Sequence, residues 1–295
     1  MKRRGQPITG WVILDKPLGL SSAAAVGIVR RLFDAAKAGH GGTLDPLATG
    51  VLPIALGEAT KTMSMVLEGD KAYRFTLTFG ESRNTDDGEG VVTATSLVRP
   101  DSAAIQAVIP RFTGAVEQVP PAYSAIKVGG ERAYALARAG EAVQLDARTV
   151  QIDRLELLSC EGDKAEFAVD CGKGTYIRSL ARDLVLALGS VGYMSALRRT
   201  KAGRFTEKAA FSLDSLEALR HSARLAEALL PLSAVLDDIP ALAMSDDDAH
   251  RLRCGQRIRV SGSTQGIVFV TADGKPVALA RIEAGVAESI RVFNL

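Results

Sequence analysis

The segment Tyr73–Phe79 alternates strictly between apolar and polar residues, and no other feature of the chain constrains its fold as much. Successive side chains of a β-strand point to opposite faces of the sheet, so the pattern predicts a strand with one buried face. Elsewhere strands and helices mix without regular β–α alternation. The sequence therefore predicts an α+β main domain, with flanking helices around a mixed, mostly antiparallel central sheet.

Several shorter patterns predict individual elements of this domain. Trp11–Leu14 has the composition of a buried strand, and Ser21 or Ser22 can cap the helix that follows it. The chain from Tyr176 onward carries apolar residues at helical spacing. Residues 120–148 combine Pro-Pro, Gly-Gly and several arginines, which indicates an excursion from the core.

Past about residue 240 the chain changes to short apolar stretches separated by turns such as Asp273-Gly274. This pattern is typical of a small all-β module. We therefore expect two domains, a main domain over residues 1–238 and the module over residues 239–295.

Composition and charge narrow the classes of function. The three cysteines and three histidines share no ligand-like spacing, so we expect neither a disulfide framework nor a metal site. No apolar run approaches the roughly 18 residues that span a bilayer. Polar Gly5-Gln6-Pro7 stands where a signal peptide needs an apolar stretch, so we expect a cytoplasmic protein without membrane contact.

Basic residues are concentrated in two parts of the chain. The segment 173–208 contains eight basic and two acidic residues, and the segment 1–37 contains seven basic and two acidic residues. These segments form a phosphate-facing surface if folding brings them together. Charge alone is equally consistent with ordinary solvated faces.

The loop His40–Gly50 is the first candidate for chemistry. It places Asp45 among glycines and directly before Pro46, which biases the aspartate backbone away from the helical region. The residues alone leave two alternatives open, a carboxylate presented to a ligand and a structural Asp-Pro turn.

A second candidate cluster is Gly172–Arg178, where glycines precede a predicted helix start. Such a start allows close approach of a phosphate or a base, although the spacing is not that of a P-loop. The residues alone allow Arg178 to pair with a carboxylate while Tyr176 lines a pocket, but they fit a solvated arginine and a half-buried tyrosine better. Tyr73 alone fits an ordinary core residue of a strand.

Five motifs together resemble the bacterial TruB-type tRNA pseudouridine-55 synthase family. They occur in the family order between residue 10 and about residue 200. They are Gly10–Ser22, Gly39–Gly50, Lys71–Arg74, Pro120–Ala125 and Lys173–Leu180.

The resemblance implies a central sheet flanked by helices, an active-site cleft across that sheet, and a C-terminal RNA-binding module of the PUA type. It also implies a loop at about residues 124–150 that grips RNA. The implied roles are a nucleophile at Asp45, an ion-pair partner for it at Arg178, a ring at Tyr73 that stacks on the flipped uracil, pocket-lining side chains at Tyr176 and Leu197, and a residue near the flipped nucleotides at His40.

The implied reaction is the conversion of one uridine in the T-loop of tRNA to pseudouridine. The reaction breaks a glycosidic bond and rejoins the base through C5, without a redox change or a lost group, so no cofactor is needed. It requires a carboxylate nucleophile and extrusion of the base from the folded RNA. Whether the carboxylate attacks the ribose, attacks the base or assists elimination stays open.

The implied partner is the T-arm of tRNA, with the acceptor stem as a further contact of the C-terminal module, and we expect a monomer. Two rival hypotheses stay open. One is a tRNA-binding or RNA-folding factor whose chemistry is secondary. The other is a glycosidase, which needs a second carboxylate near Asp45, and only Asp86 or Asp87 offers one.

Overall fold

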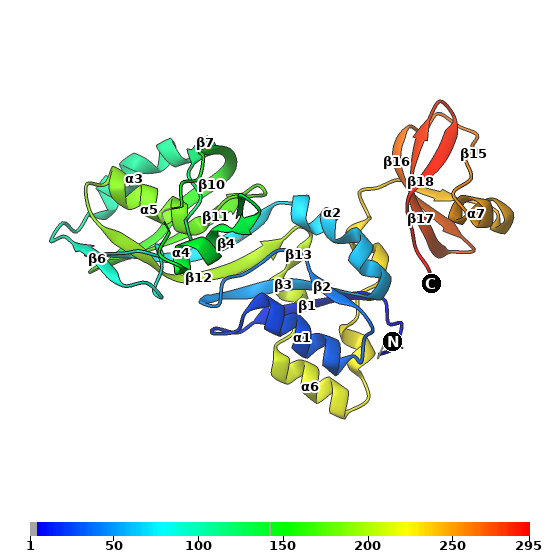
Figure 1. The fold of residues 1–295 in the computed structure, drawn as a ribbon, viewed down its shortest axis with the longest axis horizontal. Helices are drawn as coiled ribbons and strands as arrows, with labels where there is room; N and C mark the ends of the chain where they lie inside the picture. The colour runs from blue at the N-terminus through cyan, green and yellow to red at the C-terminus, as the bar shows by residue number, and fades with distance from the viewer. Residues whose placement is uncertain (1–4, 125, 142) are drawn as a thin grey trace.

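The computed structural model describes residues 5–124, 126–141 and 143–295, which form two large β-sheets, two two-stranded sheets and several helices (Figure 1). The larger sheet has nine strands. Seven lie in the order β1-β3-β12-β4-β11-β10-β7, β2 pairs with β3, and β13 pairs with β12. Their bounds are β1 Gly10–Lys16, β2 Ala38–His40, β3 Ala48–Leu56, β4 Lys71–Phe79, β7 Gly114–Gln118, β10 Arg148–Glu161, β11 Lys164–Cys171, β12 Gly192–Ala202 and β13 Phe205–Thr206.

Every strand pairing in this sheet is antiparallel except that between β12 and β3. The prediction of a mixed, mostly antiparallel sheet is thus confirmed. The alternating segment Tyr73–Phe79 lies in β4, which pairs with β11 on one side and β12 on the other. Phe75 and Leu77 are almost fully buried, and Arg74 is exposed, so one face of β4 is buried as predicted.

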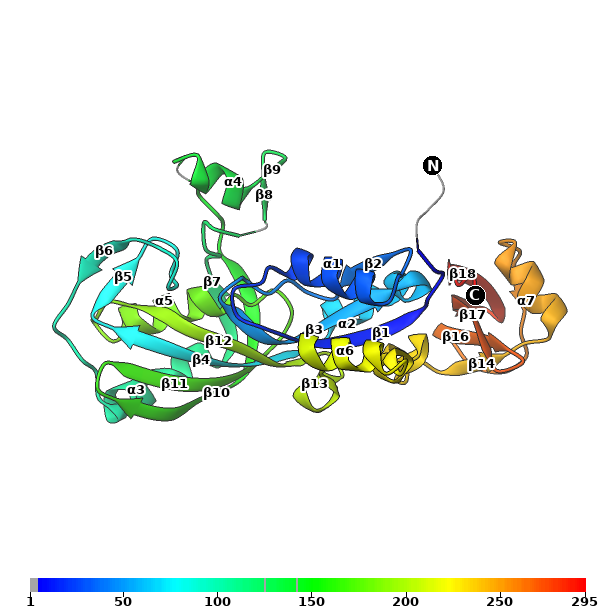
Figure 2. The same cartoon turned by 90° about the horizontal axis from the view of Figure 1, so that it is seen from below.

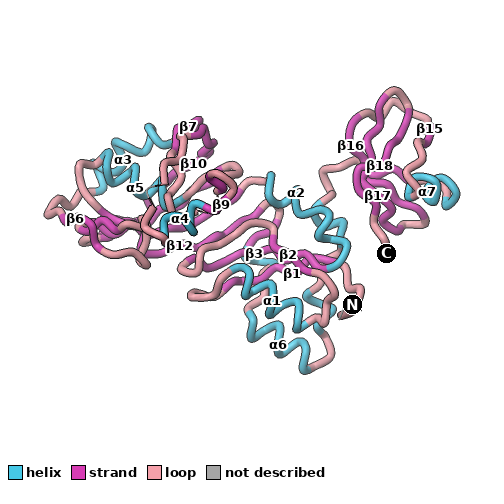
Figure 3. The backbone as a smooth tube through the Cα atoms, in the orientation of Figure 1, coloured by secondary structure: helices cyan, strands magenta, loops and turns pink. Residues whose placement is uncertain are grey.

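The main core lies between the sheet and helices α1 (Ser22–Leu32) and α5 (Ile177–Ala187). Phe75 and Phe167 stack within it, with ring centroids 5.0 Å apart. Helix α6 (Leu213–His221) packs against α1 and β1 at one edge of the sheet (Figure 3). Three shorter pieces complete this part of the molecule, namely α2 Met63–Glu68, α3 Ser102–Val108 and the hairpin of β5 Glu81–Arg83 with β6 Val92–Thr95.

The segment between β7 and β10, residues 119–147, is called the projecting loop below, and its described part extends away from the larger sheet (Figure 2). The loop carries a short hairpin, β8 Lys127–Val128 with β9 Glu131–Arg132, and the helix α4 Ala133–Arg138. The sequence predicted the excursion but not these elements. Ala125 and Ala142 of the expected RNA-gripping loop lie outside the described residues.

The second sheet has five strands in the order β14-β16-β17-β18-β15, and its own core. These strands are β14 Ala241–Ala243, β15 Ile258–Arg259, β16 Gly266–Ala272, β17 Lys275–Glu283 and β18 Val286–Val292. The C-terminal sheet that the sequence predicted is therefore present. One helix that it did not predict, α7 Asp246–Arg253, packs against strands of this sheet.

The second sheet is joined to the first part of the chain by an apolar cluster. Phe269, Leu279 and Phe293 belong to one buried cluster with Trp11 and Leu232. Polar contacts add to it: the Lys61 ammonium donates to Val292 O at 2.8 Å, and Asn294 N donates to a Glu58 carboxylate oxygen at 2.8 Å.

The three cysteines, Cys160, Cys171 and Cys254, are free thiols. Within residues 5–124, 126–141 and 143–295, no group of three or more His, Cys, Asp or Glu side chains is arranged to hold a metal ion. None of the helices in these residues has the length and apolar character needed to cross a membrane.

Candidate active site

Asp45 lies in a loop between β2 and β3 that is anchored on both sides of the aspartate. On one side Ser22 Oγ accepts from Leu44 N and donates to Leu44 O, both at 2.8 Å. Ser22 is free to do this because Ser21, not Ser22, caps helix α1. On the other side the buried Lys16 ammonium donates to Pro46 O at 3.4 Å. The loop thus holds the Asp45 carboxylate in place while leaving it 38% exposed.

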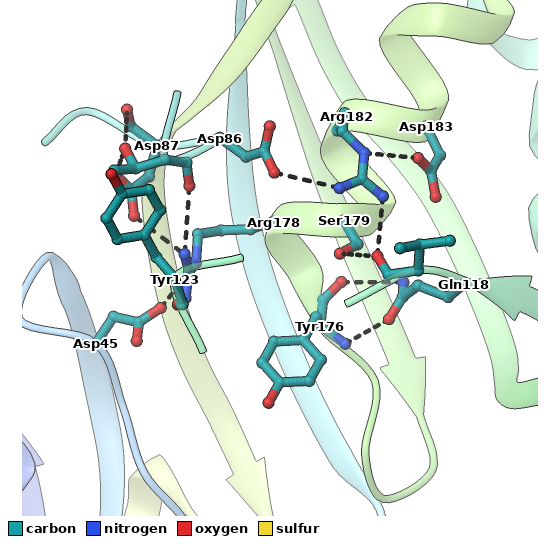
Figure 4. Close-up of polar contacts among 12 residues, drawn as sticks. Asp45, Asp86, Asp87, Gln118, Tyr123, Tyr176, Arg178, Ser179, Arg182 and Asp183 are labelled. Carbon is teal, nitrogen blue, oxygen red and sulfur yellow. Dashed lines mark hydrogen bonds and ion pairs between the residues drawn. The ribbon is translucent and has the colours of Figure 1, made fainter. Parts of the chain in front are cut away.

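Arg178 Nε lies 3.0 Å from Asp45 Oδ2 (Figure 4). The arginine side chain is only 6% exposed, and it comes from the first turn of α5. Its other nitrogens donate to Thr85 O at 3.2 Å and Tyr123 O at 2.9 Å. A buried guanidinium with its remaining donors occupied in this way keeps one orientation toward the carboxylate.

Asp87 lies on the other side of the same guanidinium, with its Oδ2 3.7 Å from Arg178 Nε. Its Oδ1 accepts from the Thr85 hydroxyl at 2.5 Å and from Glu89 N at 3.0 Å. The neighbouring Asp86 pairs at 3.4 Å with Arg182, one helical turn after Arg178. Two successive turns of α5 therefore hold the Asp86-Asp87 turn beside Asp45.

Tyr176 occupies the N-cap position of α5 and is half-buried. Its backbone is held by the side-chain amide of Gln118, which accepts from Tyr176 N at 2.8 Å and donates to Tyr176 O at 3.0 Å. The Arg148 guanidinium carbon lies 4.9 Å from the centroid of the Tyr176 ring.

Tyr73 is half-buried on β4, directly across from Arg199 on β12. Burial raises the pKa of the Tyr73 hydroxyl, and Asp45 and Cys171 act in the same direction, whereas Arg199 opposes them. Arg199 is 1% exposed and donates to backbone carbonyls, with Nε 2.7 Å from Val51 O and Nη2 3.1 Å from Gly42 O. It therefore ties the Asp45 loop to the strand that faces Tyr73.

Lys16 is a second buried cation beside Asp45. Its ammonium donates to Leu20 O at 2.6 Å and Pro17 O at 3.0 Å. Burial lowers the pKa of Lys16 to about 8, with Arg199 adding to that shift and Asp45 opposing it.

His40 and Leu197 lie near this group without a polar contact to Asp45. Leu197 is 9% exposed on β12, opposite Phe75 of β4 and Ala48 of β3. His40 is half-buried at the end of β2, and its buried Nδ1 has no hydrogen-bond partner among the described residues. Burial lowers the pKa of His40, and Arg199 adds to the effect.

The basic segments of the sequence do not all face solvent. Lys16, Arg178 and Arg199 are buried and bind the site's own carboxylates or carbonyl groups, so they are not available to a phosphate. The charge count therefore overstates the basic surface.

Four residues of the site were not singled out by the sequence, namely Lys16, Gln118, Tyr123 and Arg199. Arg199 had a usable signal, because it lies two positions after the apolar Leu197 and so on the same face of a strand in regular alternation. The other three carry no pattern of their own. Gln118 is uncharged and bonds to the backbone of Tyr176. Tyr123 takes part through its own backbone carbonyl, and Lys16 donates to backbone carbonyls, so no side-chain pattern records these contacts.

The site combines an accessible carboxylate with a fixed, buried arginine and two nearby aromatic side chains. This arrangement fits a carboxylate nucleophile held in one orientation beside a planar substrate group. It fits a glycosidase less well. The second carboxylate, Asp87, is 4% exposed, and each of its contacts is with a donor, which is unlike a carboxylic acid that must give a proton to a leaving group.

Comparison with known proteins gives two matching family profiles. Residues 30–177 match "TruB family pseudouridylate synthase (N terminal domain)" and residues 178–237 match "tRNA pseudouridylate synthase B C-terminal domain".

Curated relatives match over the whole chain. A tRNA pseudouridine synthase B of Bradyrhizobium diazoefficiens is 53% identical, with 100% of this chain and 88% of the relative covered. A tRNA pseudouridine synthase B of Rhodospirillum rubrum is 52% identical, with 100% of this chain and 99% of the relative covered. Among solved structures, a chain from a crystal structure of a Cbf5–Nop10–Gar1 complex is 26% identical, with a TM-score of 0.73 over 97% of this chain and 85% of that one.

Proposed function

Because this chain belongs to the TruB family of pseudouridylate synthases, we propose that it isomerises the T-loop uridine at position 55 of tRNA to pseudouridine, with Asp45 as the nucleophile. Its relatives are named tRNA pseudouridine synthase B, and an enzyme of this kind is an isomerase that acts on a tRNA uridine. The observation that carries the assignment of Asp45 is its geometry: a 38% exposed carboxylate lies 3.0 Å from a buried guanidinium.

The surrounding side chains support the reaction in separate ways. Arg178 holds the Asp45 carboxylate in one orientation. Tyr73 stacks on the extruded uracil, and Tyr176 and Leu197 line its pocket. His40 fills space beside the flipped nucleotides. Isomerisation of uridine to pseudouridine transfers no electrons to an acceptor and adds no group to the base. We therefore propose that the reaction at Asp45 uses neither a cofactor nor a metal.

Recognition of tRNA involves more than the pocket. Extrusion of a base costs a few kcal/mol, which contacts elsewhere on the RNA must offset. We assign the gripping of the T-arm to the loop of residues 124–150 in a catalytic domain of residues 1–238. We assign contact with the acceptor stem to residues 239–295, as an RNA-binding module of the PUA type. A monomer working in the cytoplasm fits these assignments.

A tRNA-binding or folding factor with secondary chemistry is the alternative function. The anchoring of the Asp45 loop by Ser22, Lys16 and Arg199 argues against it, because binding alone does not require a carboxylate fixed beside a buried arginine. The two functions are compatible in one protein, so the test must follow product as well as binding.

The test uses wild-type protein and an unmodified tRNA transcript, with pseudouridine mapped by carbodiimide modification and primer extension. We expect one stop at the T-loop uridine, and no stop in a control transcript with cytidine at that position. Tight binding of the transcript without any pseudouridine would favour the binding factor. A stop at another uridine would overturn the assignment of the substrate position.

A further inference from the structure

The projecting loop begins and ends beside the turn that carries Tyr176 and Arg178. Strand β7 leads into the loop and ends at Gln118, and strand β10 leads out of it and begins at Arg148. Gln118 and Arg148 are directly paired in the antiparallel ladder between these strands. Side chains of directly paired residues lie on the same face of a sheet, close together.

Both members of this pair contact Tyr176, and they hold different parts of it. Gln118 is 1% exposed, and its amide bonds to both Tyr176 N, at 2.8 Å, and Tyr176 O, at 3.0 Å (Figure 4). The Arg148 guanidinium lies over the tyrosine ring, with its carbon 4.9 Å from the ring centroid, and it also donates to Gly174 O. A guanidinium in this position is attracted to the ring face. One residue thus fixes the backbone of Tyr176 and the other fixes its ring.

The same end of the loop is joined to the next residues of α5. Val119 O accepts from Ser179 Oγ at 2.8 Å and from Arg182 Nη2 at 2.9 Å. Tyr123 O accepts from Arg178 Nη2 at 2.9 Å. Tyr176, Arg178, Ser179 and Arg182 along this face of α5 therefore each contact either Gln118 or the start of the loop.

We infer that Gln118 and Arg148 are positioning residues that clamp Tyr176 between them and so join the projecting loop to the active site. This inference rests on the proposed function, in which Tyr176 lines the uracil pocket. Because Gln118 and Arg148 are paired in the sheet, they hold Tyr176 at a fixed place, and loss of either contact would let the tyrosine leave the geometry that the reaction requires. An error of about 1 Å in such a group can cost about a hundredfold in rate.

The simpler account of Arg148 is a contact with an RNA phosphate, for which any positive charge suffices. The variants Arg148→Lys and Arg148→Gln separate the two accounts. Lysine keeps the charge but lacks the planar group that covers the ring, whereas glutamine lacks the charge. Arg224→Lys is the matched control, because Arg224 is exposed and pairs only with Glu227 of the same turn.

The measurements are the single-turnover rate at saturating tRNA and the dissociation constant of tRNA at several salt concentrations. We expect Arg148→Lys to lower the rate by about tenfold or more. We expect its dissociation constant to stay within about twofold of the wild type. A phosphate contact instead predicts a normal rate for Arg148→Lys, with a weaker affinity and a salt dependence reduced by about one unit for Arg148→Gln. That result would overturn the inference for Arg148.

Double variants test whether Arg148 acts through the ring. The Tyr176→Phe variant keeps the aromatic ring, so adding Arg148→Lys to it should lower the single-turnover rate by the same factor as Arg148→Lys does in the wild type. The Tyr176→Leu variant has no aromatic ring, so adding Arg148→Lys to it should lower the single-turnover rate no further. Equal losses in both backgrounds would contradict the inference.

Gln118→Met tests the backbone half of the clamp. Methionine has a similar length but no amide, so Tyr176 N loses the bond to Gln118, and Tyr176 O keeps its helical bond from Leu180 N but loses the one from Gln118. We expect a rate at saturating tRNA lowered by about tenfold, when the rate is normalised to the protein that binds tRNA. A purely structural role would lower the melting temperature and leave that normalised rate unchanged. Product formed by the wild type in the same assay keeps these outcomes distinct from a failure of the proposed function.

Discussion

Arg178 Nε lies 3.0 Å from Asp45 Oδ2, although the two residues come from distant parts of the chain. Asp45 comes from the loop before β3, and Arg178 comes from the first turn of α5. The same guanidinium also reaches Thr85 O, Tyr123 O and Asp87, so it links the Asp45 loop to the start of the projecting loop. The orientation of the proposed nucleophile therefore depends on Arg178 as well as on the anchoring of its own loop.

Replacing Arg178 with lysine should slow the reaction at saturating tRNA by about a hundredfold. A lysine keeps the charge but is a point donor, and it cannot bond to Asp45, Thr85 O and Tyr123 O in the fixed directions of a guanidinium. Single-turnover kinetics with excess enzyme measure the effect. A rate close to that of the wild type would show that the charge alone is sufficient.

Asp87→Asn should lower both stability and rate. The change removes a buried charge beside Arg178 while keeping the shape of the side chain, and a buried hydrogen-bonded group of this kind contributes about 1–3 kcal/mol. Urea denaturation and single-turnover kinetics give the two values. Asp86→Asn is the matched control, since Asp86 pairs with Arg182 and not with Arg178, and it should leave the rate much closer to normal.

Lys16 should make a pH-dependent contribution to stability above neutral pH. Burial lowers its pKa in the folded protein to about 8, from 10.5 in an exposed lysine. Below pH 8 both the folded and the unfolded chain hold the proton, so Lys16 adds no pH dependence there. Between about pH 8 and 10.5 the unfolded chain binds more protons, so this group raises the free energy of unfolding with pH, by at most about 1 kcal/mol per pH unit.

The check on Lys16 is urea denaturation of the wild type and of Lys16→Met at pH 7, 8, 9 and 10. The other titrating groups are common to both proteins, so the difference in slope between them belongs to Lys16. The wild type should gain stability relative to Lys16→Met as pH rises through this window. Parallel curves would contradict the lowered pKa.

Phe293→Ala should destabilise the protein by about 3–5 kcal/mol. Phe293 is 1% exposed and belongs to the cluster that joins the second sheet to Trp11. Thermal or urea unfolding measures the loss. Ile267→Ala is the control, because Ile267 lies on the same sheet but is 41% exposed, and it should cost less than about 1 kcal/mol. Equal losses would show that the cluster does not stabilise the junction.

The elements that could be predicted from the sequence are those with a local pattern. The alternation in Tyr73–Phe79 predicted β4, and the serines before α1 predicted its cap, although they did not say which serine would cap and which would hold Leu44. Helix α7 was missed because it is short and buries only Ala249 and Leu252. Its cap at Ser245 and its three first-turn aspartates were nevertheless a usable helix signal.

The site was predictable only through its motifs. Asp45, Tyr73 and Arg178 belong to segments that can be recognised in the sequence. The contacts that the backbone and neighbouring strands make around them cannot be recognised there. Gln118 and Arg199 act on backbone groups of distant segments, and those contacts exist only after the strands have paired. A sequence pattern records which side chains are present, and it does not record which carbonyl groups they will meet.

The central claim is that Asp45 is the nucleophile, and single-turnover conversion of tRNA by Asp45→Asn and Asp45→Ala tests it most directly. Asparagine keeps the shape of the side chain, and alanine excludes recovery by deamidation. The account predicts that pseudouridine formation at the T-loop uridine falls by about a thousandfold or more in both variants, while tRNA binding persists. Pseudouridine formed by either variant at close to the wild-type rate would contradict it.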